Sequence, residues 1–176
     1  MKRTVIRSAE DPFYPAFLAL CESSFPLSER RSPEDQRRLF SEDAYTLEAW
    51  AEGDLPAGFL GWWDCGDWRY AEHFAIHPAC RSTGYGSRFL SEWMHESDLP
   101  VLLEIEPATD ETARRRQRFY HRLGFVDSDI VHYQPPYHRD MPAVRLWLMS
   151  WPQPLTQAAY EKFRQIQQTE IIPFFH

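Results

Sequence analysis

The stretch YAEHFAIHPACRSTGYGSRFL, residues 70–90, decides the fold. Residues 70–77 are rich in aromatic and apolar side chains and predict a strand. The strand is expected to end at Pro78, because proline donates no ladder hydrogen bond. A short basic loop with Gly84 and Gly86 follows, and apolar residues then recur at helical spacing from Ser87 onward. The stretch therefore predicts a strand, a glycine turn and a helix.

A strand, a glycine turn and a helix start together form an anion site. The free N–H groups of the first helical turn point into the loop, and the helix dipole favours negative charge there. Gly84 and Gly86 let the backbone approach a phosphate without a Cβ in the way. Arg81 can add a charge-assisted hydrogen bond. The loop has neither the GK ending of a Walker loop nor the third glycine of a dinucleotide fingerprint, and a tight turn without a ligand is the alternative.

Two motifs carry a resemblance to a known family. Residues 81–86, RSTGYG, preceded by HP, fit the pattern R/Q-x-x-G-x-G/A and closely resemble the acyl-CoA pyrophosphate loop of the GNAT family of N-acetyltransferases. Residues 118–125, RFYHRLGF, resemble the second signature of the family, a helix that ends in YxxLGF. The resemblance covers residues 3–149. It implies an α/β fold with a mixed central sheet flanked by helices, and acetyl-CoA as the co-substrate.

Composition limits the class of protein. The chain has 176 residues and a net charge of −7, which makes nucleic acid an unexpected partner and suits a cationic substrate. Its three cysteines are scattered and include no CxxC pair, which favours reduced thiols in a cytoplasm. No signal peptide or membrane-spanning stretch is evident, so we expect a cytoplasmic protein without a membrane partner.

The order of the expected elements agrees with the resemblance. Strands are expected at residues 3–7, 45–52, 55–64, 70–77, 101–106, 125–133 and 144–149. Helices are expected at residues 13–24, 33–40, from 87, at 111–123 and at 155–168. Gly53-Asp54 is a hairpin signal, and Gly124 a helix cap. We expect a GNAT domain at residues 1–150 and a C-terminal helical extension at residues 151–176, packed on or near it.

Two residues are candidates for the chemistry. Glu72 is a carboxylate on an otherwise apolar strand face beside the loop, and it is the best general base. Its position coincides with a glutamate of family members that act on small amines, and the alternative is a structural carboxylate paired to a nearby arginine. Tyr120 matches the family's YxxLGF tyrosine. The resemblance implies that it protonates the coenzyme A thiolate or holds the sulfur; the alternative is a plain core tyrosine.

The resemblance also implies the binding residues. It places backbone contacts to the pantetheine arm at Phe74, Ala75 and Ile76. It places N–H groups for the pyrophosphate at Arg81, Ser82, Thr83, Gly84, Tyr85, Gly86 and Ser87. For the acceptor, Glu29 and Glu104 could receive an ammonium group and Arg30 a carboxylate, with Tyr137 in the loop before the last strand; solvated charges are the alternative for the charged residues.

A metal site is not expected. His73 and His77 lie four residues apart on a strand, roughly 13 Å at about 3.3 Å per residue, so they cannot share one ion.

The sequence thus predicts an acyl-CoA-dependent N-acetyltransferase that acts on a primary amine of a small molecule, by direct attack in a ternary complex. Three alternatives stay open. They are a protein or peptide N-acetyltransferase, a non-catalytic coenzyme-A-binding regulator, and a partner-binding module that docks through the C-terminal helix. A homodimer is left open as well.

Overall fold

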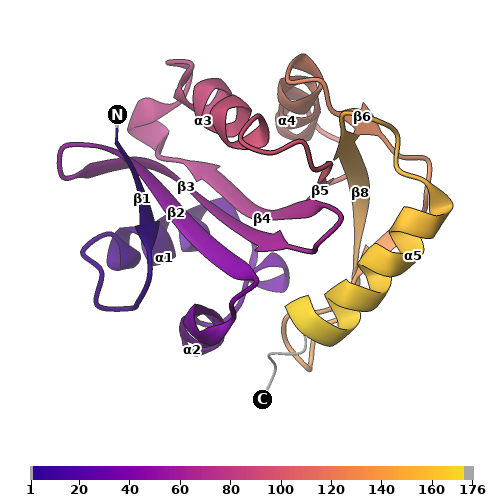
Figure 1. The fold of residues 1–176 in the computed structure, drawn as a ribbon, viewed down its shortest axis with the longest axis horizontal. Coiled ribbons are helices and arrows are strands. Elements are labelled where there is room, and N and C mark those ends of the chain that lie inside the picture. Colours follow the sequence, from indigo (N-terminus) through magenta and orange to yellow (C-terminus); the bar gives the residue numbers. More distant parts are fainter. Residues whose placement is uncertain (1, 173–176) are drawn as a thin grey trace.

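A computed structural model describes residues 2–172. One mixed sheet forms the centre of the molecule, with helices on both faces (Figure 1). The strands are β1 Lys2–Ile6, β2 Tyr45–Glu52, β3 Leu55–Asp64, β4 Arg69–Ile76, β5 Val101–Ile105, β6 Val126–Asp127, β7 His132–Gln134 and β8 Val144–Trp151. The helices are α1 Tyr14–Ser24, α2 Pro33–Arg38, α3 Tyr85–Met94, α4 Glu111–Arg122 and α5 Gln157–Ile166.

The sheet has the order β1-β2-β3-β4-β5-β8-β6, and β7 also pairs with β8. The pairing of β4 with β5 is parallel, and the other pairings are antiparallel. Two groups of buried side chains cover the sheet. One contains Phe17 of α1 and Phe163 of α5, and the other contains Trp93 of α3 and Tyr120 of α4. Figure 1 shows α3 and α4 together along one side and α1 and α2 on the opposite side.

The parallel strands β4 and β5 stay paired over only three residues. Their register runs from Arg69 opposite Val101 to Ala71 opposite Leu103, and it ends there. On the other side of β4 the register with β3 shifts at the same level, so that Glu72 is a bulge residue. The β5-facing edge of β4 therefore offers unpaired backbone groups from residue 72 onward, which must find other partners.

Most expected elements are confirmed, with shifted ends. Gly53 and Gly124 both adopt positive φ, 62° and 88°, as the hairpin and the helix cap require. Helix α3 begins at Tyr85 rather than Ser87, because Gly84 with φ 85° is its N-cap. The strand expected at residues 125–133 is wrong as one element: β6 and β7 are separate, since Ser128 Oγ accepts the N–H of Ile130 in a turn.

The C-terminal extension packs on the sheet. Phe163 of α5 is fully buried, with its ring 5.5 Å from Trp68 and 5.1 Å from Tyr70. A short π-helical turn, Gln167–Ile171, follows α5. The carbonyl of Ile171 accepts a 2.5 Å hydrogen bond from Arg31 Nη2. The last part of the apolar tail, residues 173–176, lies outside the described residues. None of the helices within residues 2–172 combines the length and the apolar character of a membrane span.

Candidate active site

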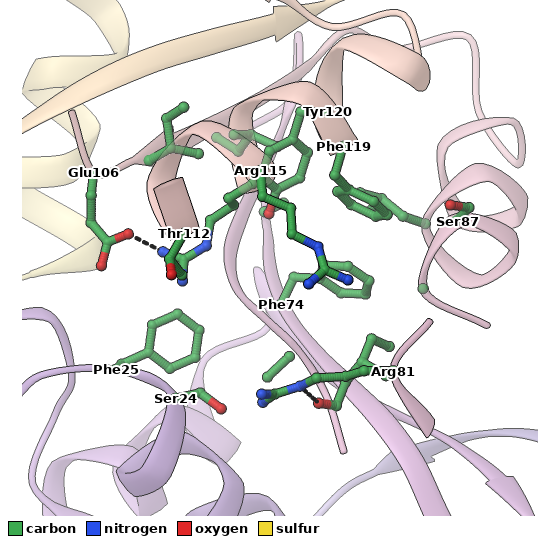
Figure 2. A pocket seen from close by; sticks show the side chains of 18 of the residues that line it. Ser24, Phe25, Phe74, Arg81, Ser87, Glu106, Thr112, Arg115, Phe119 and Tyr120 are labelled. Atoms are coloured by element: carbon green, nitrogen blue, oxygen red, sulfur yellow. Dashed lines mark hydrogen bonds and ion pairs between the residues drawn. The ribbon is translucent and has the colours of Figure 1, made fainter. Parts of the chain in front are cut away.

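A cleft of about 680 Å³ opens where β4 and β5 part. Helices α3 and α4 line it on one face, and the end of α1 with the following segment lines it on the other. Figure 2 shows Phe119 and Tyr120 on α4 opposite Phe74 and Arg81, with Ser24 and Phe25 at the lower edge. The cleft thus follows from the splayed strands, which no sequence pattern had indicated.

The glycine loop forms one end of the cleft. Gly84 makes no side-chain cap on α3, so the first N–H groups of the helix are free to face an anion. A Cβ on Gly86 would lie 3.2 Å from Ile76 Cγ1, because the helix approaches β4 closely there. Of the residues predicted to bind the cofactor, eight line the cleft: Phe74, Ala75, Ile76, Arg81, Ser82, Gly84, Gly86 and Ser87. Thr83 and Tyr85 are not among the lining residues; Thr83 Oγ1 donates to the Cys80 carbonyl at 2.6 Å.

Arginines gather at the same end. Arg81 Nε donates to the Ile76 carbonyl at 2.9 Å, which holds the loop against the end of β4. Arg115 of α4 donates to Ser82 Oγ at 3.1 Å and so links the helix to the loop. Arg122 also lines the cleft. This end can therefore bind a group that carries several negative charges.

Tyr120 lines the cleft with an unengaged hydroxyl. The side chain is 7% exposed, and its ring packs against Phe119 and Phe125 at 5.1 and 5.6 Å. Within residues 2–172 the hydroxyl has no hydrogen-bond partner. Burial raises the pKa of Tyr120 to about 12, so the phenol keeps its proton at neutral pH. The hydroxyl is available to donate to a group bound in the cleft.

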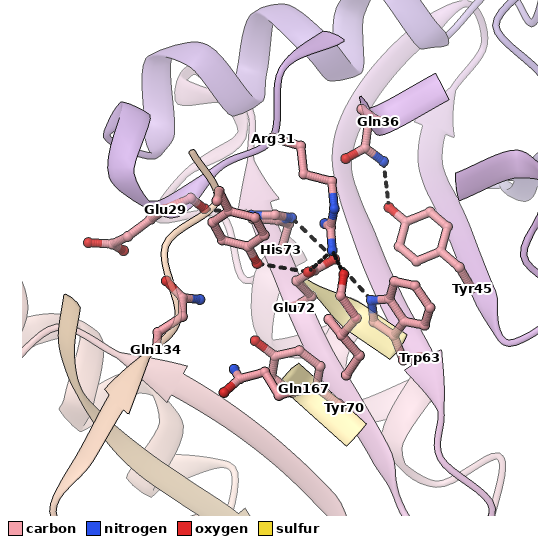
Figure 3. Close-up of polar contacts among 12 residues, drawn as sticks. Glu29, Arg31, Gln36, Tyr45, Trp63, Tyr70, Glu72, His73, Gln134 and Gln167 are labelled. Atoms are coloured by element: carbon pink, nitrogen blue, oxygen red, sulfur yellow. Dashed lines mark hydrogen bonds and ion pairs between the residues drawn. The ribbon is translucent and has the colours of Figure 1, made fainter. Parts of the chain in front are cut away.

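Glu72 reaches the cleft with its backbone rather than its carboxylate. The side chain has no exposed area, although the residue as a whole is partly exposed. The carboxylate accepts from Arg31 Nη2 at 2.7 Å, the Tyr137 hydroxyl at 2.8 Å and Trp63 Nε1 at 3.1 Å. Figure 3 shows Arg31 and Trp63 directed toward it. Burial alone would raise the pKa of Glu72, but the Arg31 guanidinium outweighs it and the pKa lies below its ordinary value. The role of Glu72 as general base stays a prediction, and this geometry makes it a weak base.

Glu104 is held by donors from three parts of the chain. Tyr70 of β4 donates to it at 2.5 Å, Gln134 of β7 at 3.1 Å and Gln167 of the C-terminal turn at 2.8 Å. His132 Nε2 contacts the same carboxylate. The C-terminal extension therefore helps to build this wall of the cleft.

Acidic side chains surround the end of the cleft beyond the arginines. The carboxylates of Glu29, Glu104 and Glu106 line this end, whereas Glu72 lines it with its backbone. Arg116 also lines it and forms an ion pair with Glu106. Of the predicted acceptor residues, Glu29 and Glu104 are in this set, whereas Arg30 and Tyr137 do not line the cleft. Arg30 donates to the Phe25 carbonyl at 3.2 Å, and Tyr137 is 1% exposed and lies under the Arg31 guanidinium.

Sequence reasoning missed two parts of the lining. The end of α1 and the residue after it contribute Ser23, Ser24 and Phe25, where the sequence predicts only the end of a helix. Helix α4 contributes Arg115 and Phe119. Arg115 lies in a run of three arginines, residues 114–116, a pattern that is equally typical of a solvated helix face. No cluster of three or more metal-ligating side chains occurs in the described part of the chain.

Comparison with known proteins agrees with this architecture. A family model described as "Acetyltransferase (GNAT) domain" matches residues 43–127. A GNAT-family structure from Bacteroides thetaiotaomicron shares 32% identity over 98% of both chains, with a TM-score of 0.87. No curated protein sequence matches.

More distant structures share the fold. Escherichia coli ElaA has 14% identity, covers 85% of this chain and 99% of its own, and gives a TM-score of 0.59. An aminoglycoside 6'-N-acetyltransferase solved with coenzyme A has 14% identity, coverage of 85% and 96%, and a TM-score of 0.60. The match to the Bacteroides structure over nearly the whole chain, C-terminal helix included, establishes the α/β fold expected from the sequence, and the chain belongs to the GNAT family of acetyltransferases.

Proposed function

We propose that this enzyme transfers the acetyl group of acetyl-CoA to a primary amine of a small molecule, by direct attack within a ternary complex. The observation that carries the proposal is the opposite charge of the two ends of the cleft. Arg81, Arg115 and the start of α3 suit the phosphates of acetyl-CoA, and the carboxylates at the other end suit an ammonium group.

The residues of the cleft suit acetyl-CoA. An extended pantetheine arm needs backbone hydrogen bonds, and β4 has an unpaired edge at Phe74, Ala75 and Ile76. The pyrophosphate needs donors, and the loop from Arg81 to Ser87 precedes and opens a ten-residue helix. We propose that residues 1–150 bind the cofactor and that the extension at 151–176 completes the acceptor end through Gln167.

The chemistry requires three proton and electron movements. The amine loses a proton, its nitrogen lone pair attacks the thioester carbonyl carbon, and the carbon–sulfur bond breaks. We propose that Tyr120 gives the leaving thiolate a proton or a hydrogen bond, because its hydroxyl is protonated and unengaged. Two carboxylates are candidates for the amine's proton: Glu72, predicted from sequence, and Glu29.

The choice of substrate can be tested with a panel of amines. Thiol release from acetyl-CoA should be fastest with cationic primary amines such as alkyl diamines and aminoglycosides. It should be slower with amino acids, since an adjacent carboxylate is repelled by the acidic end of the cleft. Peptides with a free N-terminus belong in the same panel. A preference for peptides would instead support a protein N-acetyltransferase, and binding of acetyl-CoA without turnover on any amine would support the regulator.

The glycine loop provides a second test. Gly84→Glu places a carboxylate at the start of α3 and should weaken acetyl-CoA binding by about 100-fold, the loss of two charge-assisted hydrogen bonds of about 1.5 kcal/mol each. Gly53→Glu is the matched control, because that glycine also has positive φ and open space around its Cβ but does not line the cleft. Calorimetry should show equal affinity for the wild type and Gly53→Glu. Equal affinity in Gly84→Glu would contradict the assignment of the loop.

A further inference from the structure

We infer that Glu29, on the segment between α1 and α2, accepts the proton of the amine before it attacks the thioester. The inference rests on the proposed function and assigns the base within that same site. It changes the role of Glu29 from a group that only receives an ammonium ion to a catalytic residue.

Glu29 differs from the other three acidic residues of the cleft. Glu72 forms an ion pair with Arg31, and Glu106 forms one with Arg116. Glu104 accepts hydrogen bonds from two amides and a phenol. In residues 2–172 the carboxylate of Glu29 has neither a hydrogen-bond nor an ion-pair partner. A base must have a free lone pair within reach of the substrate, and Glu29 meets that condition.

The backbone of Glu29 is fixed although its carboxylate is free. Glu29 is the last residue of a 3₁₀ turn, Leu27–Glu29. Its carbonyl oxygen is 2.8 Å from His73 Nε2 of β4, and the carbonyl of Arg30 is 3.0 Å from His138 Nε2. Figure 3 shows the Glu29 carboxylate directed away from the Glu72 group. The side chain thus extends from a backbone anchored to both β4 and the loop before β8.

The surroundings tune Glu29 for proton transfer. Burial, together with the negative charges of Glu106 and Glu104, raises the pKa of Glu29 to about 7 against the opposing effect of Arg116. The neighbouring His73 does not share this range, because burial lowers its pKa below 6.5. A base with a pKa near the working pH is half ionised and still basic enough to take a proton, which is the best compromise for general base catalysis.

In the proposed step two protons leave the substrate nitrogen and one reaches the sulfur. The substrate enters as an ammonium ion, and one N–H proton passes to the Glu29 carboxylate, which leaves a neutral amine and a neutral carboxylic acid. The nitrogen lone pair then forms the bond to the thioester carbon, and the carbon–sulfur bond breaks. The second N–H proton leaves with solvent, and the thiolate takes a proton from Tyr120. The proton held by Glu29 then passes through solvent to the Tyr120 phenolate, so that amide, thiol, one released proton and the regenerated enzyme result.

The test is the pH dependence of kcat/KM for the best amine of the panel, in wild type, Glu29→Gln and Glu34→Gln. The kcat/KM of wild type should rise with pH and level off above about pH 7, as Glu29 ionises. Glu29→Gln must use free amine from solution, so its activity should be about 100-fold lower at pH 7, without the inflection, and should continue to rise toward the pKa of the amine. The Glu34 side chain is 77% exposed and does not line the cleft, so the pH profile of Glu34→Gln should match that of wild type.

Other results would contradict the role of Glu29 as base or the proposed function itself. An inflection that persists in Glu29→Gln, or a loss that is constant across pH, would overturn the role of Glu29 as base and leave acetyl transfer intact. A rise in KM for the amine with unchanged kcat would show that Glu29 only binds the ammonium group. Absence of acetylation by wild type on every amine would overturn the proposed function and this inference together. Circular dichroism of Glu29→Gln separates a catalytic loss from misfolding.

Discussion

Tyr120→Phe should lower kcat by about 10²- to 10⁴-fold while the affinity for acetyl-CoA stays unchanged. As the acyl group leaves, negative charge gathers on the sulfur, and a phenol in the cleft stabilises it only at that moment. An interaction made mainly in the transition state lowers turnover and not binding when it is lost. Because the hydroxyl has no hydrogen-bond partner among residues 2–172, its removal should change the melting temperature little.

The matched control for Tyr120→Phe is Tyr14→Phe. Tyr14 is also buried, at 2% exposed, but it lies on α1 and does not line the cleft. Steady-state kinetics, calorimetry with acetyl-CoA and thermal unfolding on the same preparations distinguish the two sites. Wild-type turnover in Tyr120→Phe would remove this residue from the mechanism, and a water molecule would be the next candidate acid.

Arg31→Met should destabilise the fold by about 3–5 kcal/mol, because it leaves the Glu72 charge buried and unpaired. Both side chains are essentially inaccessible, with 1% and 0% of their area exposed. Methionine retains most of the apolar stem, so packing changes little. The free energy of unfolding in urea measures the effect. The double variant Arg31→Met with Glu72→Gln should recover most of the loss. The amide carries no charge, its oxygen can still accept from Trp63, and its NH2 group can donate to the Tyr137 hydroxyl oxygen.

Arg38→Met is the control for the buried pair. Arg38 pairs with Glu34 at 2.9 Å on the surface, where 37% and 77% of the side chains are exposed, so this change should cost less than about 1 kcal/mol. Equal losses in Arg31→Met and Arg38→Met would show that burial of the Arg31–Glu72 pair has no energetic consequence.

The same pair predicts how stability depends on pH. The folded-state pKa of Glu72 is lowered, so its contribution is present above about pH 4.5 and is lost as pH falls through the folded value. The stability of Arg31→Met should instead rise as pH falls. Burial without the guanidinium raises the pKa of Glu72 and favours its protonated form. The difference in stability between wild type and Arg31→Met should therefore shrink as pH falls, and a constant difference would contradict this account.

Short-range patterns explain why much of the fold was predictable. Gly53 and Gly124 mark turns that require positive φ, and the apolar spacing of α3 follows directly from residues 89–94. The division of β6 from β7 falls at Asp127-Ser128-Asp129, a polar run typical of a turn, where Ser128 Oγ accepts the N–H of Ile130. The apolar residues on both sides of this run had favoured one continuous strand.

The roles of the acidic residues depended on long-range contacts that no local pattern contains. Glu72 and Arg31 are far apart in sequence, and their ion pair forms because the segment after α1 crosses the bulge in β4. Gln167 reaches Glu104 from the C-terminal turn, 63 residues away. Sequence thus located carboxylates near the cleft but could not tell which were paired and which, like Glu29, were free.

The central claim is direct transfer from acetyl-CoA to an amine held in the same cleft. Initial rates of acetylated amine formation, measured while both substrate concentrations vary, test it most directly. The account predicts double-reciprocal lines that intersect, together with no acetylated protein in the intact mass after incubation with acetyl-CoA alone. Parallel lines together with an acetylated enzyme would contradict it, because they would require a covalent intermediate on the protein.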